Sequence, residues 1–596
     1  MKAVAASLAA PTLVAAATLI AFLPVLQNGF TNWDDYTNLL SNPNYRGLSW
    51  PHLVWMFTSI ADSLYRPLTW LTFGADYVLW QMNPAGYHFS ALFFHVANAV
   101  LFFFVARKLF VIETRAGVHA VVAAVMAALF FSVHPLRVEA VAWTQARENV
   151  VAGLFFLLTL ICYLKAVANG GAYQRWMLAA IISYALCLLG KGAFVTLPIG
   201  LLIIDFYPLR RFNRAAWIEK TPFFVLALIA GLIAIYAKNQ GHLLYGLDEY
   251  SLLQRLGIAA YGMVFYLWKT VAPVKLSPLY EMPQSVDAMT PYFIGSAAAA
   301  SGLTVVLFAL RRRAPAALAT WLWYVALLAP TSGIMQNGLQ IAADRYTYLP
   351  SLSLALLAAA LLLRWRDRIV STAAGATLVA VVLAGLSWQQ TKVWRNSANL
   401  WFHAVSINPT SYVAHQFLGS ALLESGQADA ALDEYRKSRD INPRYASAYM
   451  SIGYILALRS DSAGAIENYR IALKLFPDSA AAHFNLANQL LKQGEIEEAV
   501  VHYGDAVRLN PNDAAARNNL GFLLARKGYA AAAEEHFRAA IHLNPYDPLA
   551  YYNLGMAALT RREYRQAAEY LRTALKLKPD SPEIRAALNR AEIGPN

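Results

Sequence analysis

Two adjacent carboxylates, Asp34 and Asp35, lie in the stretch NWDDYTNLLSNPNY (32–45), directly after the first apolar run of the chain. A carboxylate can accept a proton from a hydroxyl group as a general base, or orient that hydroxyl through a hydrogen bond. Charged side chains beside a membrane-length apolar segment are costly and therefore suggest a function. The alternative is that the pair only solvates the end of a helix. On this observation alone both roles stay open.

Further polar residues lie near the ends of apolar runs, on the same side of the predicted membrane as the Asp pair. They are Arg66, His134, Glu139, Arg147, Lys191 and Arg345, in the segments YRPLT, HPLRVEAV, QAREN, LGKGAF and ADRYTYLP. Arginine and lysine at the bilayer edge suit a phosphate headgroup. We predict that the four cations bind the phosphate of a lipid-linked substrate, with His134 and Glu139 in supporting roles. The structural alternative is that these residues fix loops or pair with one another.

No metal cofactor is expected. The histidines of the first half show no spacing typical of zinc ligands, and no glycine-rich phosphate-binding loop occurs. A lipid-monophosphate donor carries one negative charge and requires no divalent cation. A pyrophosphate donor would favour one, so a divalent metal is possible but not preferred.

The bulk composition indicates a membrane protein with at least two domains. The chain has 596 residues, of which 58% are hydrophobic and 14% charged, and a single soluble core rarely grows this large. The net charge of +13 comes largely from Lys and Arg in short loops between apolar runs, as in cytoplasmic loops, and does not indicate nucleic-acid binding. Cys162 and Cys187 lie inside apolar runs and imply no disulfide framework.

The first part of the chain predicts a polytopic transmembrane bundle of about eleven helices, since each span needs about 20 mostly apolar residues. The first apolar run is interpreted as a retained helix. The segment 251–273 is expected to be a non-spanning outer helix, because a pass there would move the basic loop 311–313 outside. The positive-inside rule then puts the outer loop 27–87 and the C-terminal part outside the cytoplasm. The expected spans lie near residues 8–26, 88–107, 118–134, 148–167, 175–190, 193–206, 221–237, 291–310, 315–330, 346–363 and 369–388.

The C-terminal part contains an internal repeat. Prolines recur every 34 residues, and a glycine or alanine keeps the same register within the repeats; the prolines are Pro409, Pro443, Pro477, Pro511, Pro545 and Pro579. This period, with its Leu-Gly pair and closing proline, resembles the tetratricopeptide repeat (TPR). We predict five full repeats over 410–579, each a helix pair, stacked into a superhelix with a concave surface.

Three asparagines occupy one position of successive repeats: Asn485, Asn519 and Asn553. An amide both donates and accepts hydrogen bonds, so such a ladder could bind a peptide backbone. The alternative is that these side chains hydrogen-bond within the superhelix. In either case the repeats predict a module that binds protein or peptide, without a catalytic constellation of their own.

The order of motifs matches a known family. The segments NWDDYTNLLSNPNY, YRPLTWLTF, HPLRVEAVAWTQAREN, KGAFVTLPIGLLIIDF and ADRYTYLPSL, followed by TPRs, resemble the transmembrane-and-TPR-containing (TMTC) protein O-mannosyltransferases of the GT-C glycosyltransferase superfamily. The resemblance covers nearly the whole chain. It departs from the family where Glu148 and Asn149 follow Arg147 in place of Ala-Asp, and where Gly192 follows Lys191 in place of an acidic residue.

The resemblance implies an all-α fold: a GT-C-type membrane domain (1–390) followed by a TPR superhelix (391–596). It implies a polyprenyl-phosphate sugar as donor and an acidic pair as catalytic motif, which Asp34 and Asp35 match. Arg66, Arg147, Lys191 and Arg345, together with His134 and Glu139, match its other polar positions. The alanine-rich chain looks bacterial, which would make the protein an integral inner-membrane protein with periplasmic TPRs.

The predicted activity is therefore the inverting transfer of a sugar, with mannose expected, from a polyprenyl phosphate to Ser or Thr of a protein bound by the TPRs. Asp34 is favoured over Asp35 as the general base. One alternative is transfer to a glycan or lipid. Another is a non-catalytic membrane scaffold or a transporter, although a transporter would distribute polar residues through the depth of its spans.

Overall fold

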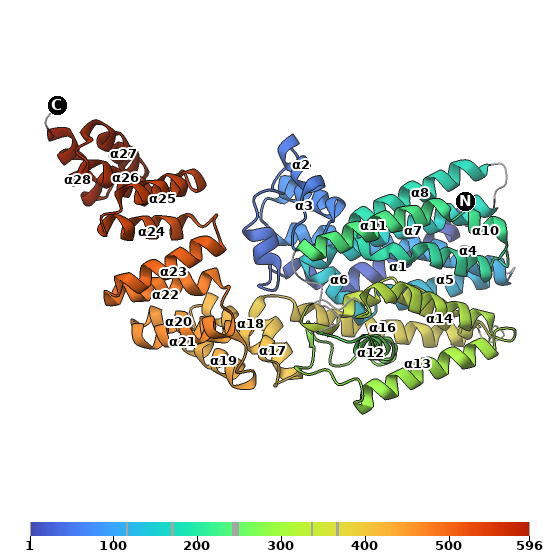
Figure 1. The fold of residues 1–596 in the computed structure, drawn as a ribbon. Coiled ribbons are helices and arrows are strands. Elements are labelled where there is room, and N and C mark those ends of the chain that lie inside the picture. Colours follow the sequence, from blue (N-terminus) through green and yellow to red (C-terminus); the bar gives the residue numbers. More distant parts are fainter. Residues whose placement is uncertain are drawn as a thin grey trace. The chain divides into compact units, whose positions relative to one another are not determined.

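The computed structural model describes residues 2–114, 117–168, 172–240, 249–334, 338–364 and 369–594. The described chain is mostly helical, as predicted (Figure 1). It departs from an all-α fold at one small antiparallel sheet, in which β1 (Tyr280–Glu281) pairs with β2 (Gln340–Ala342). The chain divides into two compact units, Met1–Pro409 and Thr410–Asn596.

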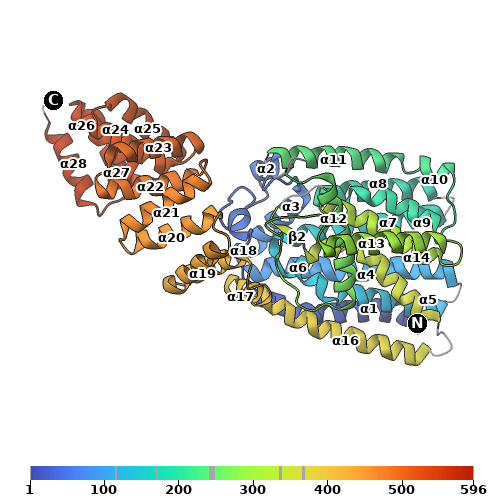
Figure 2. The ribbon, with the colours of Figure 1, turned by 60° about the horizontal axis from the view of Figure 1, so that its bottom comes forward.

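Long apolar helices build the first unit and run alongside one another in both views (Figures 1 and 2). The helix α7 packs along both α8 and α4, and α4 also packs along α5. Their sequences are mostly apolar, as expected for helices that face lipid and one another. The bounds are α1 (Lys2–Phe22), α4 (Pro84–Thr114), α5 (Gly117–Ser132), α7 (Arg147–Ala168), α8 (Tyr173–Gly190), α11 (Thr221–Gln240), α13 (Pro291–Ala309) and α16 (Ile369–Val393).

The predicted count of about eleven spans is not confirmed. Among the described residues, six helical segments are long and apolar enough to cross a membrane, or seven if the bent pair Gly117–Ser132 and Pro135–Ala142 is one span. Several expected spans fall on helices shorter than the roughly 20 residues that a bilayer requires, including α9 (Leu197–Phe206), α14 (Pro315–Leu328) and α15 (Ser351–Leu362). The helix α12 (Leu252–Val271) is not among the candidate spans.

The segment that carries the Asp pair forms a folded cap. It runs from the end of α1 through α2 (Trp50–Thr58) to α3 (Pro67–Trp80). Its core is aromatic: Tyr45 lies 5.8 Å from Trp70 between ring centroids, and Phe73 stacks on Tyr87 at 6.2 Å. Because these rings are buried, the backbone around Asp34 is held in place by packing.

The helix α17 (Ser397–Ile407) belongs to the first unit, so the division lies later than the predicted boundary at 390. Trp401 is buried and donates from Nε1 to Oδ1 of Asn32 at 2.7 Å. The ring of Trp401 also lies 4.8 Å from that of Trp33. The helix α17 therefore packs against the loop that carries the Asp pair.

The second unit forms a helix pair for each predicted repeat and one further helix. Small residues allow the two helices of a pair to approach: a Cβ on Gly453 would lie 2.8 Å from the Tyr469 ring. The helices are α18 (Tyr412–Glu424), α19 (Ala428–Ile441), α20 (Ala446–Leu458), α21 (Ser462–Leu475), α22 (Ala480–Gln493), α23 (Ile496–Leu509), α24 (Ala514–Arg526), α25 (Ala530–Leu543), α26 (Pro548–Thr560), α27 (Tyr564–Leu577) and α28 (Pro582–Ile593).

Candidate active site

A cavity of about 580 Å³ is lined by four of the eight polar residues that the sequence singled out in the membrane part: Asp34, Arg66, Lys191 and Arg345. Its wall comes from the loop after α1, the turn before α3, the start of α7, the end of α8, the length of α11 and the loop before α15. Acidic and basic side chains meet there: Asp34, Asp62, Glu148, Arg66, Lys191, Lys238 and Arg345.

Asp34 lines this cavity and is half-buried. Loss of water around its carboxyl raises its pKa to about 6, and the negative charge of Asp62 adds to the rise. The positive charges of Arg345 and Arg66 oppose it. A carboxylate with a pKa near 6 is mostly ionised at pH 7 and still basic enough to accept a proton efficiently.

Asp35 lies in different surroundings from its neighbour. It is buried, and its Oδ2 accepts hydrogen bonds from the Thr31 backbone N–H at 2.8 Å and from the Thr31 hydroxyl at 3.2 Å. Burial raises the pKa of Asp35 to about 7, against the lowering effect of these two hydrogen bonds. Asp35 does not line the cavity; its observed contacts fix the turn that presents Asp34.

Asp62 lies at the tip of a tight turn in which Ala61 and Leu64 exchange backbone hydrogen bonds. Asp62 and Ser63 have φ angles of 54° and 56°. A turn with positive φ at both central positions is a two-residue hairpin turn, and it costs residues other than glycine conformational energy. Asn38 donates to Oδ2 of Asp62 at 3.3 Å. The turn therefore holds a second carboxylate at the cavity wall.

Glu148 lies between two of the predicted phosphate ligands. Its Oε2 is 3.3 Å from Nη1 of Arg66, and its Oε1 is 2.9 Å from Nζ of Lys191. Arg66 also donates to Oε1 of Gln145 at 2.9 Å, and Lys191 to Oδ1 of Asn149 at 2.7 Å. One carboxylate thus holds two cations in fixed positions and leaves the trio with one net positive charge.

Glu139 holds Arg345 in position. Their side chains form a buried ion pair, and Oε2 of Glu139 also accepts the backbone N–H of Arg345 at 2.8 Å. The Arg345 guanidinium lies 4.9 Å from the ring centres of both Trp143 and Tyr346. Glu139 therefore orients a residue of the cavity wall.

Lys238 lines the same cavity near the end of α11. Within the described part of the chain, no carboxylate forms an ion pair with Lys238. The wall beside it is apolar, with Leu188 and Leu189 on α8, and Leu226, Ile229 and Ile233 on α11, which lies in a candidate membrane span. The cavity therefore combines a cationic end with a hydrocarbon-lined side.

Besides Asp35 and Glu139, two more predicted residues do not line the cavity: Arg147 and His134. Arg147 is fully buried, forms an ion pair with Asp76, donates to the carbonyl of Tyr87, and has its guanidinium 4.4 Å from the Phe73 ring centre. It does not line the cavity, so its contacts do not fit the predicted role in binding phosphate. His134 is buried, accepts the N–H of Leu136 at 3.2 Å and caps a short helix.

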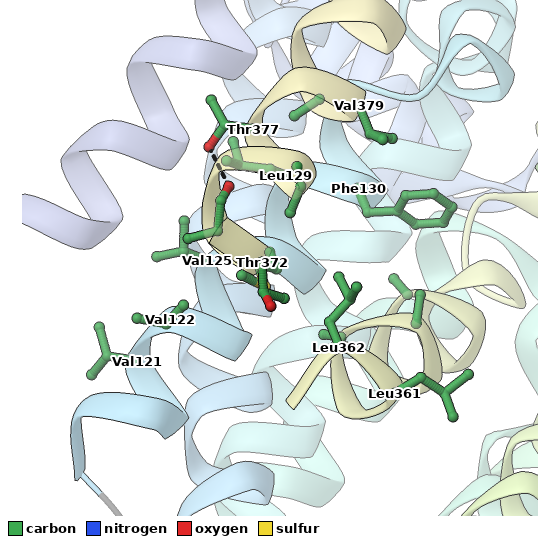
Figure 3. A pocket seen from close by; sticks show the side chains of 18 of the residues that line it. Val121, Val122, Val125, Leu129, Phe130, Leu361, Leu362, Thr372, Thr377 and Val379 are labelled. Atoms are coloured by element: carbon green, nitrogen blue, oxygen red, sulfur yellow. Dashed lines mark hydrogen bonds between the residues drawn. The ribbon is translucent and has the colours of Figure 1, made fainter. Parts of the chain in front are cut away.

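A larger cavity of about 880 Å³ lies between α5, α15 and α16 (Figure 3). Its labelled side chains are apolar except for two threonines, and they include Leu129, Phe130 and Leu362. None of the described residues that line it is ionisable. It offers no group for acid–base chemistry or phosphate binding, and the smaller polar cavity remains the candidate site.

Two of the three ladder asparagines hydrogen-bond within the superhelix. Asn553 is buried and donates to Oδ1 of Asn518 at 3.0 Å, and Asn519 donates to the Tyr503 hydroxyl at 3.3 Å. These contacts fit the alternative role of the ladder, in which its asparagines hydrogen-bond within the superhelix. Asn485 is half-buried on the equivalent helix α22.

Comparisons with known proteins found models of a repeat family and curated relatives. Models of the tetratricopeptide repeat match residues 418–480, 459–505, 487–528 and 548–581. Curated relatives include protein O-mannosyl-transferase F38B6.6 of Caenorhabditis elegans, 23% identical over 70% of this chain, and human TMTC1, 25% identical over 72%. The relatives of this chain are TMTC-type protein O-mannosyltransferases.

The matched regions cover 60% of the F38B6.6 sequence and 54% of TMTC1, so the chain spans little more than half the length of these relatives. Human TMTC4 is 31% identical over 32% of this chain, which is 28% of its own length. Among solved structures, YrrB, a TPR protein with an unusual peptide-binding site, is 24% identical, with a TM-score of 0.30, over 33% of this chain and 100% of its own.

Sequence reasoning did not select Asp62, Lys238 or Glu148 as site residues. Asp62 precedes Arg66 in the segment ADSLYRP, and Glu148 is adjacent to Arg147. Lys238 directly follows the expected span 221–237, and a lysine at a helix end reads as a topology signal. For Asp62 and Glu148, the available signal was their proximity in sequence to predicted residues.

Proposed function

We propose that this chain is a membrane glycosyltransferase that moves a sugar, with mannose expected, from a polyprenyl phosphate to a Ser or Thr hydroxyl of a protein. One observation carries the proposal: a single cavity joins a carboxylate with a pKa near 6, several cations and an apolar wall made by α8 and α11. The kinship with protein O-mannosyltransferases supports the same reaction.

The donor is proposed to bind with its lipid along the apolar faces of α8 and α11 and its phosphate against Lys238, Lys191 and Arg66. Lys238 has no carboxylate partner among the described residues, so a phosphate diester would neutralise it directly. Glu148 keeps Lys191 and Arg66 in position before the donor arrives, which lowers the reorganisation needed on binding. Arg147 is left out of this site because its charge is matched by Asp76.

Asp34 is proposed as the general base. Its carboxylate takes the proton of the acceptor hydroxyl as the oxygen attacks the anomeric carbon from the side opposite the phosphate. The new carbon–oxygen bond forms while the bond from that carbon to the phosphate oxygen breaks, and the configuration at the carbon inverts. Asp35 positions the turn that carries Asp34 through its hydrogen bonds to Thr31.

The leaving group is a polyprenyl phosphate, which departs with the electron pair of the broken bond. Its phosphate gains negative charge as it leaves, and the cations of the cavity stabilise that charge. Phosphate monoesters leave without protonation, so the mechanism requires no separate general acid, and it involves no metal. The TPR repeats are proposed to recruit the acceptor protein, at the outer, periplasmic face of the inner membrane.

The experiment uses the full chain in lipid nanodiscs, polyprenyl-phosphate mannose labelled in the sugar, and a mixture of unfolded Ser- and Thr-rich polypeptides. The expected result is labelled polypeptide from which alkaline β-elimination releases the sugar, as it does from Ser and Thr linkages. Label found only in glycan or lipid would reject the protein acceptor. Absence of any donor turnover would reject the transferase and leave a membrane scaffold with a TPR arm.

A further inference from the structure

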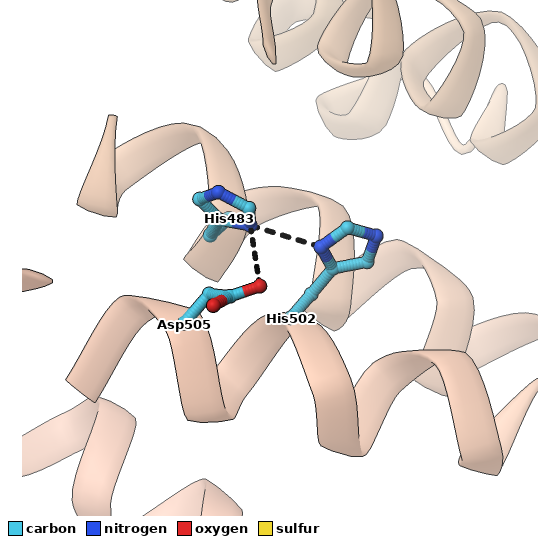
Figure 4. A group of neighbouring side chains, drawn as sticks. All are labelled: His483, His502 and Asp505. Carbon is cyan, nitrogen blue, oxygen red and sulfur yellow. Dashed lines mark hydrogen bonds and ion pairs between the residues drawn. The ribbon is translucent and has the colours of Figure 1, made fainter. Parts of the chain in front are cut away.

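Three ligand-type side chains converge on one helix pair of the second unit. Figure 4 shows His483 on α22 facing His502 and Asp505, which lie one turn apart on α23. Nδ1 of His483 is 2.9 Å from Nδ1 of His502 and 3.8 Å from Oδ2 of Asp505. One ligand atom from each residue lies within 4.8 Å of the others, and all three side chains are half-buried.

The outward-facing atoms of these side chains are already held by neighbours. Nε2 of His483 lies 3.0 Å from the carbonyl of Pro477. A carbonyl only accepts hydrogen bonds, so Nε2 carries the proton. In the neutral imidazole, Nδ1 of His483 is then an unprotonated lone pair directed into the cluster.

The other two ligands also have polar neighbours, although Glu498 lies at ion-pair rather than hydrogen-bond distance from His502. Nε2 of His502 is 3.6 Å from Oε1 of Glu498, whose carboxylate is held by Arg470 at 2.8 Å. Oδ1 of Asp505 accepts from Arg508 at 3.0 Å, which leaves Oδ2 toward the histidines. Metal-bound histidines typically donate their second nitrogen to a carbonyl or carboxylate in this way, and ligating carboxylates are themselves hydrogen-bonded.

A metal ion between the two imidazoles would account for the short distance between their Nδ1 atoms. Without an ion, a separation of 2.9 Å requires a proton on one of the two Nδ1 atoms. Moving the His502 proton to Nε2, where Glu498 can accept it, would free a second lone pair. Zinc–ligand bonds of about 2.0–2.2 Å in a tetrahedron set the ligand atoms about 3.3–3.6 Å apart. The observed 2.9 and 3.8 Å bracket that spacing, so small side-chain movements would suffice.

The other repeats show that the fold itself does not demand this cluster. At the three equivalent positions, 34 residues apart, the first repeat has His415, Glu434 and Lys437, and the repeat after the cluster has Arg517, His536 and Ala539. In the first repeat, Nζ of Lys437 pairs with Glu434 at 2.7 Å. A cationic lysine there fills the place that Asp505 occupies in the cluster. Only the third repeat combines two histidines with a carboxylate.

We propose that His483, His502 and Asp505 form a binding site for a divalent transition-metal ion, zinc above all, that joins the two helices of the third repeat. Two imidazole nitrogens and one carboxylate oxygen are ligands that zinc prefers. The fourth coordination position faces solvent and is filled by water. The site is independent of the membrane cavity and of the proposed transferase activity.

The test measures zinc binding to the full chain, purified in detergent with a tag that contains no histidine and stripped with a chelator. Zinc chloride is titrated against a competing chromophoric chelator, and thermal unfolding is followed with and without zinc. The expected result is one tight site per chain and a higher unfolding temperature with zinc, because an ion that binds only the folded state stabilises it. Magnesium, which prefers all-oxygen octahedral sites, is expected to leave the unfolding temperature unchanged.

The decisive variant is the double substitution His502→Gln with Asp505→Asn, which keeps size and hydrogen bonding. Loss of a supporting neighbour alone costs about 10- to 100-fold in affinity, so loss of two ligands is expected to cost at least about 100-fold. His536→Gln, at the position equivalent to His502 in the next repeat, is the matched control and should retain the site. The proposal is overturned if the parent binds no zinc, or if the double variant binds it as tightly as the parent.

Discussion

Asp34 and Asp35 are adjacent in the chain and differ in what they contact: Asp34 lines the polar cavity, whereas Asp35 is buried and accepts two hydrogen bonds from Thr31. The sequence favoured Asp34 over Asp35 as the base, and this difference in contacts gives a structural reason for that choice. One carboxylate can reach a substrate hydroxyl, and the other stabilises the turn that positions it.

The pH dependence of transfer should follow Asp34. Burial raises the pKa of Asp34 to about 6. A general base acts only when deprotonated, so kcat/KM is expected to rise with pH up to about 6 and to level off above it. Initial rates of donor turnover between pH 4.5 and 8 measure this. A rate independent of pH through this range would contradict the assignment.

Asp62→Asn should shift that profile. The negative charge of Asp62 contributes to the raised pKa of Asp34, so its removal lowers the pKa of Asp34 and moves the acid limb of the profile to lower pH. Asn keeps the shape of the turn. The matched control is Asp433→Asn, an exposed carboxylate on the TPR helix α19, which should leave the profile in place. An unshifted limb in Asp62→Asn would show that the two carboxylates do not interact.

Lys238→Met should weaken donor binding. A hydrogen bond to a charged group contributes about 1.5–3 kcal/mol, so the Kd for polyprenyl-phosphate mannose is expected to rise about tenfold or more. The comparison is Lys165→Met, a lysine in the last turn of α7 that does not line the cavity. Equal affinity of both variants for labelled donor would remove Lys238 from the phosphate site.

Arg147→Met should lower stability and leave donor affinity intact in the folded fraction. It would leave Asp76 buried without its ion-pair partner, and breaking a buried pair costs about 3–5 kcal/mol. The double variant with Asp76→Asn removes both charges and should recover part of that loss. Thermal unfolding in detergent, followed by donor binding at a temperature where the variant is folded, separates the two effects. Weakened binding by fully folded protein would restore Arg147 to the donor site.

The sequence predicted some of the residues that line the cavity, but it could not say which of their neighbours also line it. Arg66, Lys191 and Arg345 meet Asp34 at one cavity, as their positions near the ends of apolar runs predicted. Arg147 and Glu148 show what could not be derived. Adjacent residues at a helix start differ by about 100° in direction, and α7 is apolar on most sides, so the sequence does not say which of the two faces the cavity.

The span count is not confirmed, for a related reason. Hydropathy marks apolar stretches, but it does not tell a full span from a short helix buried among others, such as α14 and α15. The TPR part was predictable repeat by repeat because its period is local in sequence. The contacts of Asn553 were not, since they depend on the packing of the neighbouring helix.

Asn553→Ala tests the role of that asparagine. Its buried hydrogen bond to Asn518 predicts a loss of about 1–3 kcal/mol in the stability of the second unit, because the Asn518 oxygen would be left unpaired. Asn485→Ala, at the equivalent and half-buried position, should cost less. Thermal unfolding of the full-length variants measures both. A larger loss for Asn485→Ala would contradict the structural role of Asn553.

The most direct test of the central claim compares Asp34→Asn with Asp35→Asn in the full chain, with donor binding and sugar transfer measured on the same samples. The account predicts that Asp34→Asn binds polyprenyl-phosphate mannose normally and loses about 10²- to 10⁴-fold in transfer rate, the usual contribution of a general base. Asp35→Asn, whose amide oxygen can still accept from Thr31, should retain most of the activity. If both variants transfer sugar like the parent, Asp34 is not the base and the proposed mechanism is wrong.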